Sequence, residues 1–219
     1  MTTTLAHSLE VQIPIGEVTL EGTLQIPEAA QGLVVFAHGS GSSRHSRRNQ
    51  YVARFLQEGR LATLLFDLLT AEEEQIDLRT RHLRFNIELL ASRMTGATNW
   101  LVQQPETQLL PRGYFGARTG AAAALVAAAA LPDVVRAVVS RRGRPDLALD
   151  ALPDVKAATL LIVGGNDTPV IAMNQVAFER LRTVKKMVII PGATHLFEEP
   201  GALEEVARLA RDWFQTYLT

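Results

Sequence analysis

The chain has 219 residues, 47% of them hydrophobic, which is enough for one domain with a substantial core. Its formal net charge of −1 argues against a general electrostatic affinity for nucleic acid or an anionic membrane. The absence of cysteine excludes disulfides, thiolate metal sites and cysteine nucleophiles. We therefore expect a cytoplasmic, single-domain protein over residues 1–219, with no signal peptide.

The chain begins with two alternating segments, residues 10–16 and 19–27, which predict an antiparallel hairpin. Six apolar runs follow, and several are too uniformly apolar to have a solvated face, as in parallel strands covered on both sides. These runs are residues 32–39, 61–69, 112–117, 135–141, 158–167 and 185–192. Helical patterns alternate with them, at residues 48–59, 79–104, 119–130, 169–184 and 200–217. The alternation predicts a doubly wound, mostly parallel α/β sheet with its ligand site at the carboxyl ends of the strands.

Three predicted strand ends carry residues in a suggestive order. A glycine-flanked turn, residues 116–120, has Arg118 at its centre, and Asp167 and His195 follow two later strands. An α/β-hydrolase places nucleophile, acid and histidine in this chain order, each on a loop after a strand. The sequence therefore predicts a catalytic-type site in which Asp167 and His195 lie within hydrogen-bonding reach.

A loop rich in glycine and serine, residues 38–43, follows an earlier strand. In this fold that position supplies backbone N–H groups to a developing oxyanion. The expected donors are the N–H groups of Ser40 and Thr119. The chain shows no metal-ligand spacing, and the loop lacks the lysine and the spacing of a phosphate-binding P-loop.

These segments together resemble α/β-hydrolases of the dienelactone-hydrolase-like group, over nearly the whole chain. The resemblance is carried by "HGSGSSRHSRRNQYVA", "ATLLFDLLT", "GYFGARTGAAAAL", "RAVVSRRGRPDLA", "LLIVGGNDTPV" and "GATHLFEEPG". It implies a sheet of about eight strands, a minimal cap, and hydrolysis of small esters, lactones or thioesters without a cofactor. Relatives in that group have serine where this chain has Arg118, and usually a small residue where it has Arg142.

Arginine at position 118 conflicts with the local requirements of the turn. The central residue needs a strained backbone, and a cation there opposes the dipole of the following helix. Its guanidinium stays protonated, so Arg118 is neither a nucleophile nor a base. Two interpretations remain open, namely a solvated side chain that swings out of a shallow site and a side chain that clamps a ligand.

Asp167 and the neighbouring arginines also have alternative interpretations. Asp167 could cap the next helix, or orient His195, or pair with Arg118 instead. Arg118 could also pair with Glu198 or Glu199. The segment "SRRGRPD" brings Arg142 and Arg144 towards the same mouth, where planar guanidinium groups suit carboxylate or phosphate. Alternatively, Arg144 is neutralised by Asp146 or Asp67, which leaves two free cations.

Three functional hypotheses follow. The chain is a serine-hydrolase relative with absent or very weak activity; or a non-catalytic domain that binds a small anion with Arg118 and Arg142; or a scaffold whose serine was replaced in the laboratory. We expect Arg118→Ser to restore labelling by a fluorophosphonate, with blocking by Arg142 the first cause of failure. The natural substrate and the oligomeric state are left open by the sequence.

Overall fold

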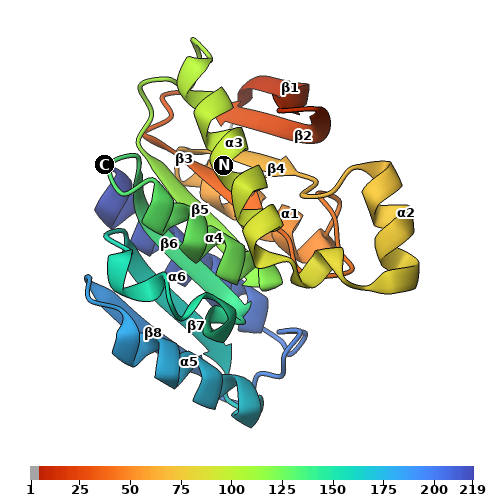
Figure 1. Cartoon of the computed structure of the whole chain (residues 1–219). Helices are drawn as coiled ribbons and strands as arrows, with labels where there is room; N and C mark the ends of the chain where they lie inside the picture. Colours follow the sequence, from red (N-terminus) through yellow and green to blue (C-terminus); the bar gives the residue numbers. More distant parts are fainter. Residues whose placement is uncertain (1–4) are drawn as a thin grey trace.

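The computed structural model describes residues 5–219, which form one eight-stranded sheet with helices on both faces (Figure 1). The strand order is β1-β2-β4-β3-β5-β6-β7-β8. The strands are β1 Leu5–Ile15, β2 Val18–Pro27, β3 Gly32–Ala37, β4 Leu61–Phe66, β5 Arg112–Arg118, β6 Val135–Gly143, β7 Ala158–Gly164 and β8 Lys185–Ile190. β2 pairs antiparallel with β1 and β4, and all other pairs are parallel. This confirms the predicted fold class, including the antiparallel hairpin.

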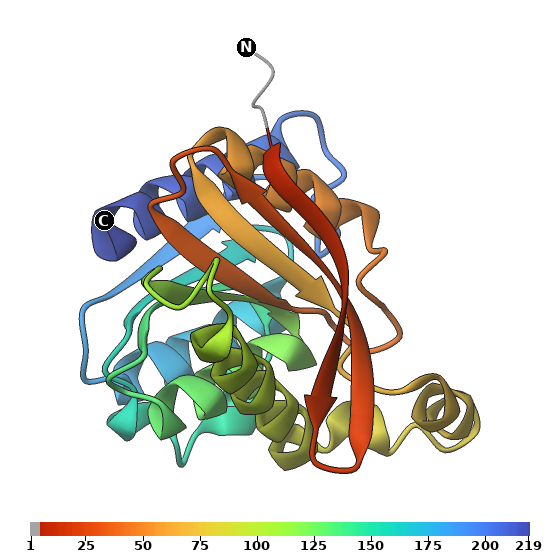
Figure 2. The same cartoon turned by 90° about the horizontal axis from the view of Figure 1, so that it is seen from above.

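Helices cover the two faces of the sheet as separate layers. The helices are α1 Arg47–Glu58, α2 Ala71–Thr80, α3 Ile87–Gln103, α4 Thr119–Ala130, α5 Thr168–Arg180 and α6 Ala202–Leu218. α3, α4 and α5 cover one face, and α1 and α6 cover the other (Figure 2). Only the short 3-10 helices η2 Pro145–Ala148 and η3 Leu152–Asp154 stand between β6 and β7, so no large cap follows β6.

Burial explains the uniform apolar runs of the central strands. Every residue of β3, β4 and β7 is buried, because helices lie on both sides of them. β8 has only one neighbouring strand and is mostly half-exposed. Because β3 to β8 run parallel, their carboxyl ends meet along one edge of the sheet, and the loops that carry positions 118, 167 and 195 lie there.

The predicted helix over residues 79–104 is wrong in its first part. A separate helix, α2, comes first, and Thr70 and Glu73 form a capping box at its start. Arg81 adopts a left-handed conformation with φ 56° and ends α2. A 3-10 turn, η1 Leu83–Phe85, precedes α3, whose first turn is capped by the Asn86 side chain. α2 projects from the body of the molecule beyond β4 (Figure 1).

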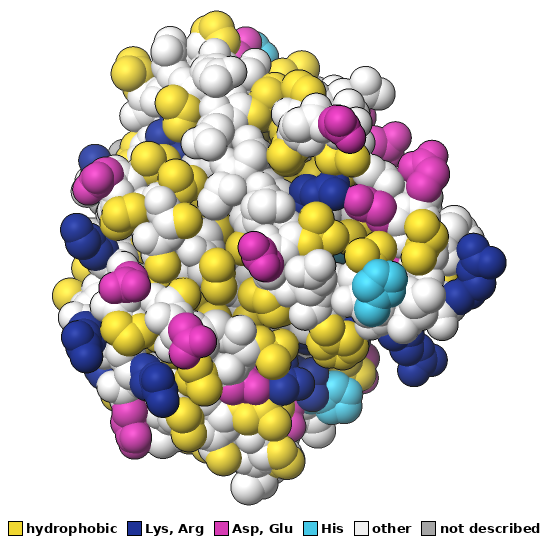
Figure 3. Space-filling model, in the orientation of Figure 1, with side chains coloured by type: hydrophobic (Ala, Val, Ile, Leu, Met, Phe, Trp, Pro, Cys, Tyr) yellow, Lys and Arg dark blue, Asp and Glu magenta, His cyan; other side chains and the backbone are white. Residues whose placement is uncertain are grey.

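Acidic and basic side chains are interspersed among apolar ones on the face that carries α3, α4 and α5 (Figure 3). No helix within residues 5–219 is both long enough and apolar enough to cross a membrane. Because charges of both signs are mixed on this face, its described residues form no extended positive patch (Figure 3).

Candidate functional site

The sharp turn between β5 and α4 has the backbone of a nucleophile elbow. Arg118 lies at its centre with φ 53° and ψ −125°, a conformation that non-glycine residues rarely adopt. A Cβ on Gly116 would lie 2.5 Å from the Cα of Ala121, and one on Gly120 would lie 2.3 Å from the carbonyl oxygen of Ala37. The two glycines are thus required for α4 to approach β5 and β3 closely, and this contact holds position 118 in its strained conformation.

The Arg118 side chain lies along the loop that follows β3. Its Nη1 donates a hydrogen bond to the carbonyl oxygen of Ser40 at 3.2 Å. A Cβ on Gly39 would lie only 2.8 Å from Cδ of Arg118, so glycine is needed for this approach. Burial, and then the positive charges of Arg142 and Arg48, lower the pKa of the Arg118 guanidinium from its ordinary value. Arg118 is therefore a partly desolvated cation within the site, and it does not swing away into solvent.

Arg142 holds the carboxylate that the sequence assigned to the histidine. Its Nε donates to Oδ2 of Asp167 at 2.8 Å, and the two side chains are 26% and 13% exposed. No hydrogen bond joins Asp167 to His195 in the described part of the chain, and His195 is exposed. The expected acid–histidine contact is therefore not formed, because a charged guanidinium is the stronger partner for the carboxylate.

Two further arginines, Arg141 and Arg48, complete the site, although neither was predicted from the sequence as a site residue. Arg141 has only 9% of its surface exposed, and its Nη2 donates to Oδ1 of buried Asn49 at 3.1 Å. Its Nε has no hydrogen-bond partner among the described residues. Burial, and then the charges of Arg48, Arg118 and Arg142, lower the pKa of Arg141 to about 10. Arg141 thus carries its positive charge without a carboxylate partner from residues 5–219.

Arg48 reaches the site from the first turn of α1. Its Nη2 donates to Oε1 of Glu198 at 2.7 Å, and this pair is substantially exposed. A cation in the first turn opposes the helix dipole, and α1 has no acidic residue there. The double arginine at the start of the predicted helix was the signal that could have identified this residue.

These side chains enclose a cavity of about 140 Å³ at the carboxyl edge of the sheet. Four arginines and one histidine line it, with no aspartate or glutamate among the lining residues. The lining residues with charged or titratable side chains are Arg48, Arg118, Arg141, Arg142 and His195. We refer to this space as the arginine cavity. Its walls present only positive or neutral groups to a ligand.

The loop at residues 38–43 follows β3 and lies beside Arg118, so the predicted oxyanion-hole donors, the N–H groups of Ser40 and Thr119, stand at the same edge of the sheet. Within residues 5–219, neither N–H group takes part in a backbone hydrogen bond outside the regular helices and strands. The Thr119 hydroxyl is also buried and without a partner there. The loop is anchored by His38, whose Nε2 accepts from the Leu68 N–H and whose Nδ1 donates to the carbonyl of Gly39, each at 3.0 Å.

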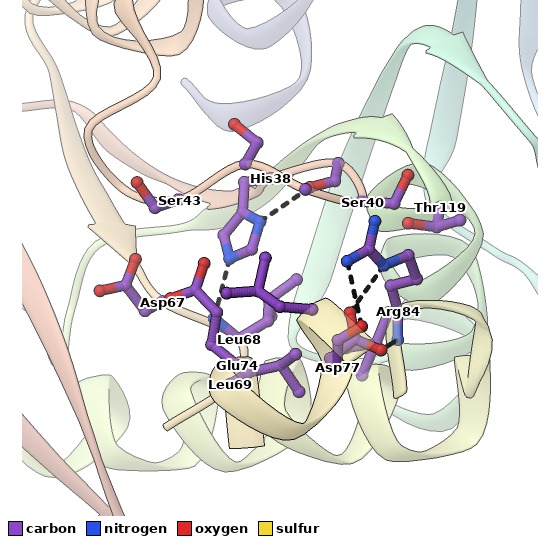
Figure 4. Close-up of a pocket in the computed structure, with 15 residues that line it drawn as sticks. His38, Ser40, Ser43, Asp67, Leu68, Leu69, Glu74, Asp77, Arg84 and Thr119 are labelled. Atoms are coloured by element: carbon purple, nitrogen blue, oxygen red, sulfur yellow. Dashed lines mark hydrogen bonds and ion pairs between the residues drawn. The ribbon is translucent and has the colours of Figure 1, made fainter. Parts of the chain in front are cut away.

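A second, smaller cavity of about 70 Å³ lies beside this loop (Figure 4). Ser40 and Thr119 stand at one side of it, and the ion pair between Asp77 and Arg84 stands at another (Figure 4). Arg84 comes from η1, so the segment around α2 closes this cavity. Gly39, Gly41 and Ser42 line both cavities, which places the loop at residues 38–43 between them.

Arg144 does not join the cluster. It makes a bidentate contact with Asp146, with hydrogen bonds of 2.8–3.2 Å, as the alternative interpretation anticipated. Asp67 pairs with Arg44 instead, and it also accepts from the Arg44 backbone N–H at 2.7 Å. These pairs anchor loops and leave the arginine cavity to the other four arginines.

Comparison with known proteins gives concordant results. The sequence profile of the dienelactone hydrolase family matches residues 20–218. The crystal structure of a dienelactone hydrolase from Anabaena variabilis is 66% identical and superposes with a TM-score of 0.95, covering 97% of this chain and 99% of that one. Est1E from Butyrivibrio proteoclasticus shares the fold, with a TM-score of 0.80 at 15% identity over 94% of this chain and 98% of that one.

Curated relatives from two strains of Mycobacterium tuberculosis are longer. They are provisionally named phosphoribosyl transferases, and each is 59% identical to this chain over 209 residues. The match covers 95% of this chain but 46% of the relative, so the chain spans about half the length of these relatives.

Proposed function

This chain belongs to the dienelactone hydrolase family, and on that premise we propose that it binds a small anion and does not hydrolyse esters through an acyl-enzyme. The proposal keeps the family's backbone but changes the use of its site. Arg118 replaces the group that would attack a carbonyl, and the cavity beside it is lined by cations. A carboxylate or phosphate is the ligand that such guanidinium groups bind best.

One observation carries this proposal: four arginines line the arginine cavity, no aspartate or glutamate is among its described lining residues, and only Arg142 and Arg48 are paired with a carboxylate. Within residues 5–219, neither Arg118 nor Arg141 has a carboxylate partner, and both are at least partly desolvated. Like charges held together in a partly buried site repel one another, which costs folding free energy unless a counter-ion is bound. A bound anion would relieve this repulsion.

The same contacts argue against hydrolysis. The arginine at position 118 forms no covalent intermediate, and Asp167 is bound to Arg142 and does not orient His195. An exposed histidine without an orienting acid is a poor general base for water activation. We therefore propose that ester or lactone hydrolysis is absent or very weak, although the Ser40 and Thr119 donors are retained.

The name of the longer relatives, phosphoribosyl transferase, mentions a phosphate-bearing group, and the proposed ligand class is consistent with that name. The transferase activity itself is not assigned to this chain, because the match covers about half of those relatives. The proposal concerns binding, and it is the same whether Arg118 is natural or introduced.

Anion titration with matched variants tests the proposal. Isothermal calorimetry and thermal unfolding are followed as phosphate, sulfate and acetate are added, for the parent, Arg118→Ala and Arg136→Ala. Arg136 is exposed at the opposite end of β6, so its removal makes the same change in net charge far from the cavity. A ligand at a hundred times its dissociation constant should stabilise the fold by about 2.7 kcal/mol.

We expect the parent and Arg136→Ala to respond equally, and Arg118→Ala to bind at least about tenfold more weakly, since hydrogen bonds to charged groups contribute about 1.5–3 kcal/mol. Binding should also weaken as salt rises. An absence of any anion response in the parent, or equal responses from both variants, would contradict the proposal.

A further inference from the structure

The arginine cavity has a definite excess of charge. Each of two arginines has one carboxylate partner, Arg142 with Asp167 and Arg48 with Glu198. Arg118 donates only to a backbone carbonyl, and Arg141 only to the Asn49 amide, among the described residues. Four guanidinium groups and two carboxylates leave two positive charges uncompensated.

Part of this excess positive charge is buried, because it belongs to Arg141. Its side chain is more than nine-tenths buried and lines the cavity, and one guanidinium nitrogen, Nε, has no hydrogen-bond partner in the part of the chain that the structure describes. A buried donor left unsatisfied is costly, and a buried unpaired charge costs more. Both costs fall when an anion with several acceptor oxygens lies against the guanidinium.

We propose that the ligand of the arginine cavity is a phosphate dianion, either free phosphate or the terminal phosphate of a monoester. This inference rests on the proposed function and narrows its ligand class. A dianion matches the two uncompensated charges, whereas a monocarboxylate leaves one of them buried. A phosphate also offers three or four oxygens, which can accept from Arg118, Arg141 and Arg142 together.

Space beside the cavity is compatible with a monoester. A wider groove of about 670 Å³ shares Ser42, Ser46 and Arg48 with the arginine cavity. Its walls include the aromatic side chains of Tyr51 and Phe197. The organic group of a phosphate ester would extend into this groove while its phosphate stays among the arginines.

The charge state of the ligand provides the test. A phosphomonoester has a second pKa of about 6, so it is a dianion at pH 7.5 and largely a monoanion at pH 5.0. Sulfate is a dianion at both values. Charged and ionisable protein groups near the ligand act on both probes, and dividing the phosphate affinity by the sulfate affinity cancels their effect. The groups that line the cavity are Arg48, Arg118, Arg141, Arg142 and His195. Asp167 and Glu198 pair with two of these arginines from outside the lining, and Glu199 lines the neighbouring groove near His195.

The probes for calorimetry are phenyl phosphate, inorganic phosphate, sulfate, dimethyl phosphate and acetate. At pH 7.5 we expect both phosphates to bind at least about tenfold more tightly than the two monoanions, dimethyl phosphate and acetate. From pH 7.5 to 5.0, the affinity for phenyl phosphate divided by that for sulfate should fall about tenfold, because only about a tenth of the ester remains dianionic. Tighter binding of phenyl phosphate than of free phosphate identifies the monoester as the source, and the reverse identifies free phosphate.

The variant Asn49→Asp removes one of the two uncompensated charges with little change in shape. It should weaken phosphate binding at least about tenfold while acetate is much less affected. Asn99→Asp, an exposed position on α3, is the matched control and should behave as the parent. Equal affinity for monoanions and dianions, or a pH-independent ratio, would overturn the phosphate inference while leaving anion binding intact. No binding of any probe would overturn both.

Discussion

The Nε atom of Arg142 lies 2.8 Å from Oδ2 of Asp167, so the carboxylate at the end of β7 is bound to a cation from β6. Arg142 adopts φ 45°, a left-handed conformation that turns its side chain out of the regular alternation of β6. This contact occupies the acid that an adjacent histidine would need, and it bears directly on whether catalysis can be restored.

Restoring the nucleophile alone should not restore the enzyme. The sequence alone predicts that Arg118→Ser restores labelling by a fluorophosphonate, but the structure changes this expectation, because Asp167 is bound to Arg142. We now expect neither the parent nor Arg118→Ser to be labelled. The double variant Arg118→Ser with Arg142→Gly frees the carboxylate and should label at position 118, as read by mass spectrometry. Stoichiometric labelling of the single variant would show that the Arg142–Asp167 pair opens easily, and labelling of the parent at Ser40 or Thr119 would identify another nucleophile.

The elbow glycines should be intolerant of any side chain. In Gly120→Ala, the added Cβ lies 2.3 Å from a backbone oxygen of β3, which cannot move without shifting the strand. We expect a loss of about 3 kcal/mol or more in the free energy of unfolding, measured by urea denaturation. Gly192→Ala, which has φ 72° but no atom within 4 Å of its Cβ, should lose only about 1 kcal/mol. Similar losses in the two variants would show that the close contact is relieved cheaply.

Removing Arg118 should stabilise the unliganded protein. Arg118→Gly relieves both the positive φ, at about 1–3 kcal/mol, and the repulsion from the neighbouring arginines. In a protein of this size, each 1 kcal/mol raises Tm by about 2–4 °C. Arg60→Gly is the control, because Arg60 is exposed and has φ 60° outside the cluster. The gain of Arg118→Gly should exceed that of Arg60→Gly at low salt and approach it in 1 M NaCl. A gain that is equal at both salt concentrations would exclude the repulsion.

His38 should make stability depend on pH. Burial lowers the pKa of His38, and its Nε2 must stay unprotonated to accept from the Leu68 N–H. The unfolded chain therefore binds more protons below about pH 6.5, so stability is full above that value and falls as the pH decreases towards the folded pKa. His38→Gln should lose this dependence in urea unfolding between pH 7.5 and 5, whereas His45→Gln, an exposed position, should retain it. An identical pH profile for His38→Gln and the parent would contradict this role.

The sequence was informative about the backbone of the site because that backbone follows from local patterns. Uniform apolar runs identify buried parallel strands, and the chain order then places residues 118, 167 and 195 on loops at one edge. Glycines at 116 and 120 indicate the turn, since their need for close approach is visible in the spacing. The missed boundary of α2 had a local signal as well, the capping box of Thr70 and Glu73.

The pairing of side chains was not predictable in the same way. Arg141 meets Asn49 from a strand 92 positions away in the sequence, and the contact depends on how α1 packs against α6 and β4. Arg141 and Arg142 are consecutive, so a regular strand would direct them to opposite faces. In the structure both side chains line one cavity, because Arg142 has a positive φ of 45°. Arginine does not favour this conformation, so the sequence does not predict it. The partner of Asp167 also depends on the folded structure, because Arg142 and not His195 comes within hydrogen-bonding distance of it.

The strained turn at position 118 also makes this chain suitable for site-directed chemistry. Its conformation is fixed by neighbouring backbone contacts, so a replacement side chain should occupy the same starting point beside the arginine cavity. The chain contains no cysteine, and Arg118→Cys would therefore introduce a single thiol. That thiol would stand at the start of α4 among guanidinium groups, an environment that favours the reactive thiolate. A fluorophore attached there would report ligand entry without competing labels elsewhere.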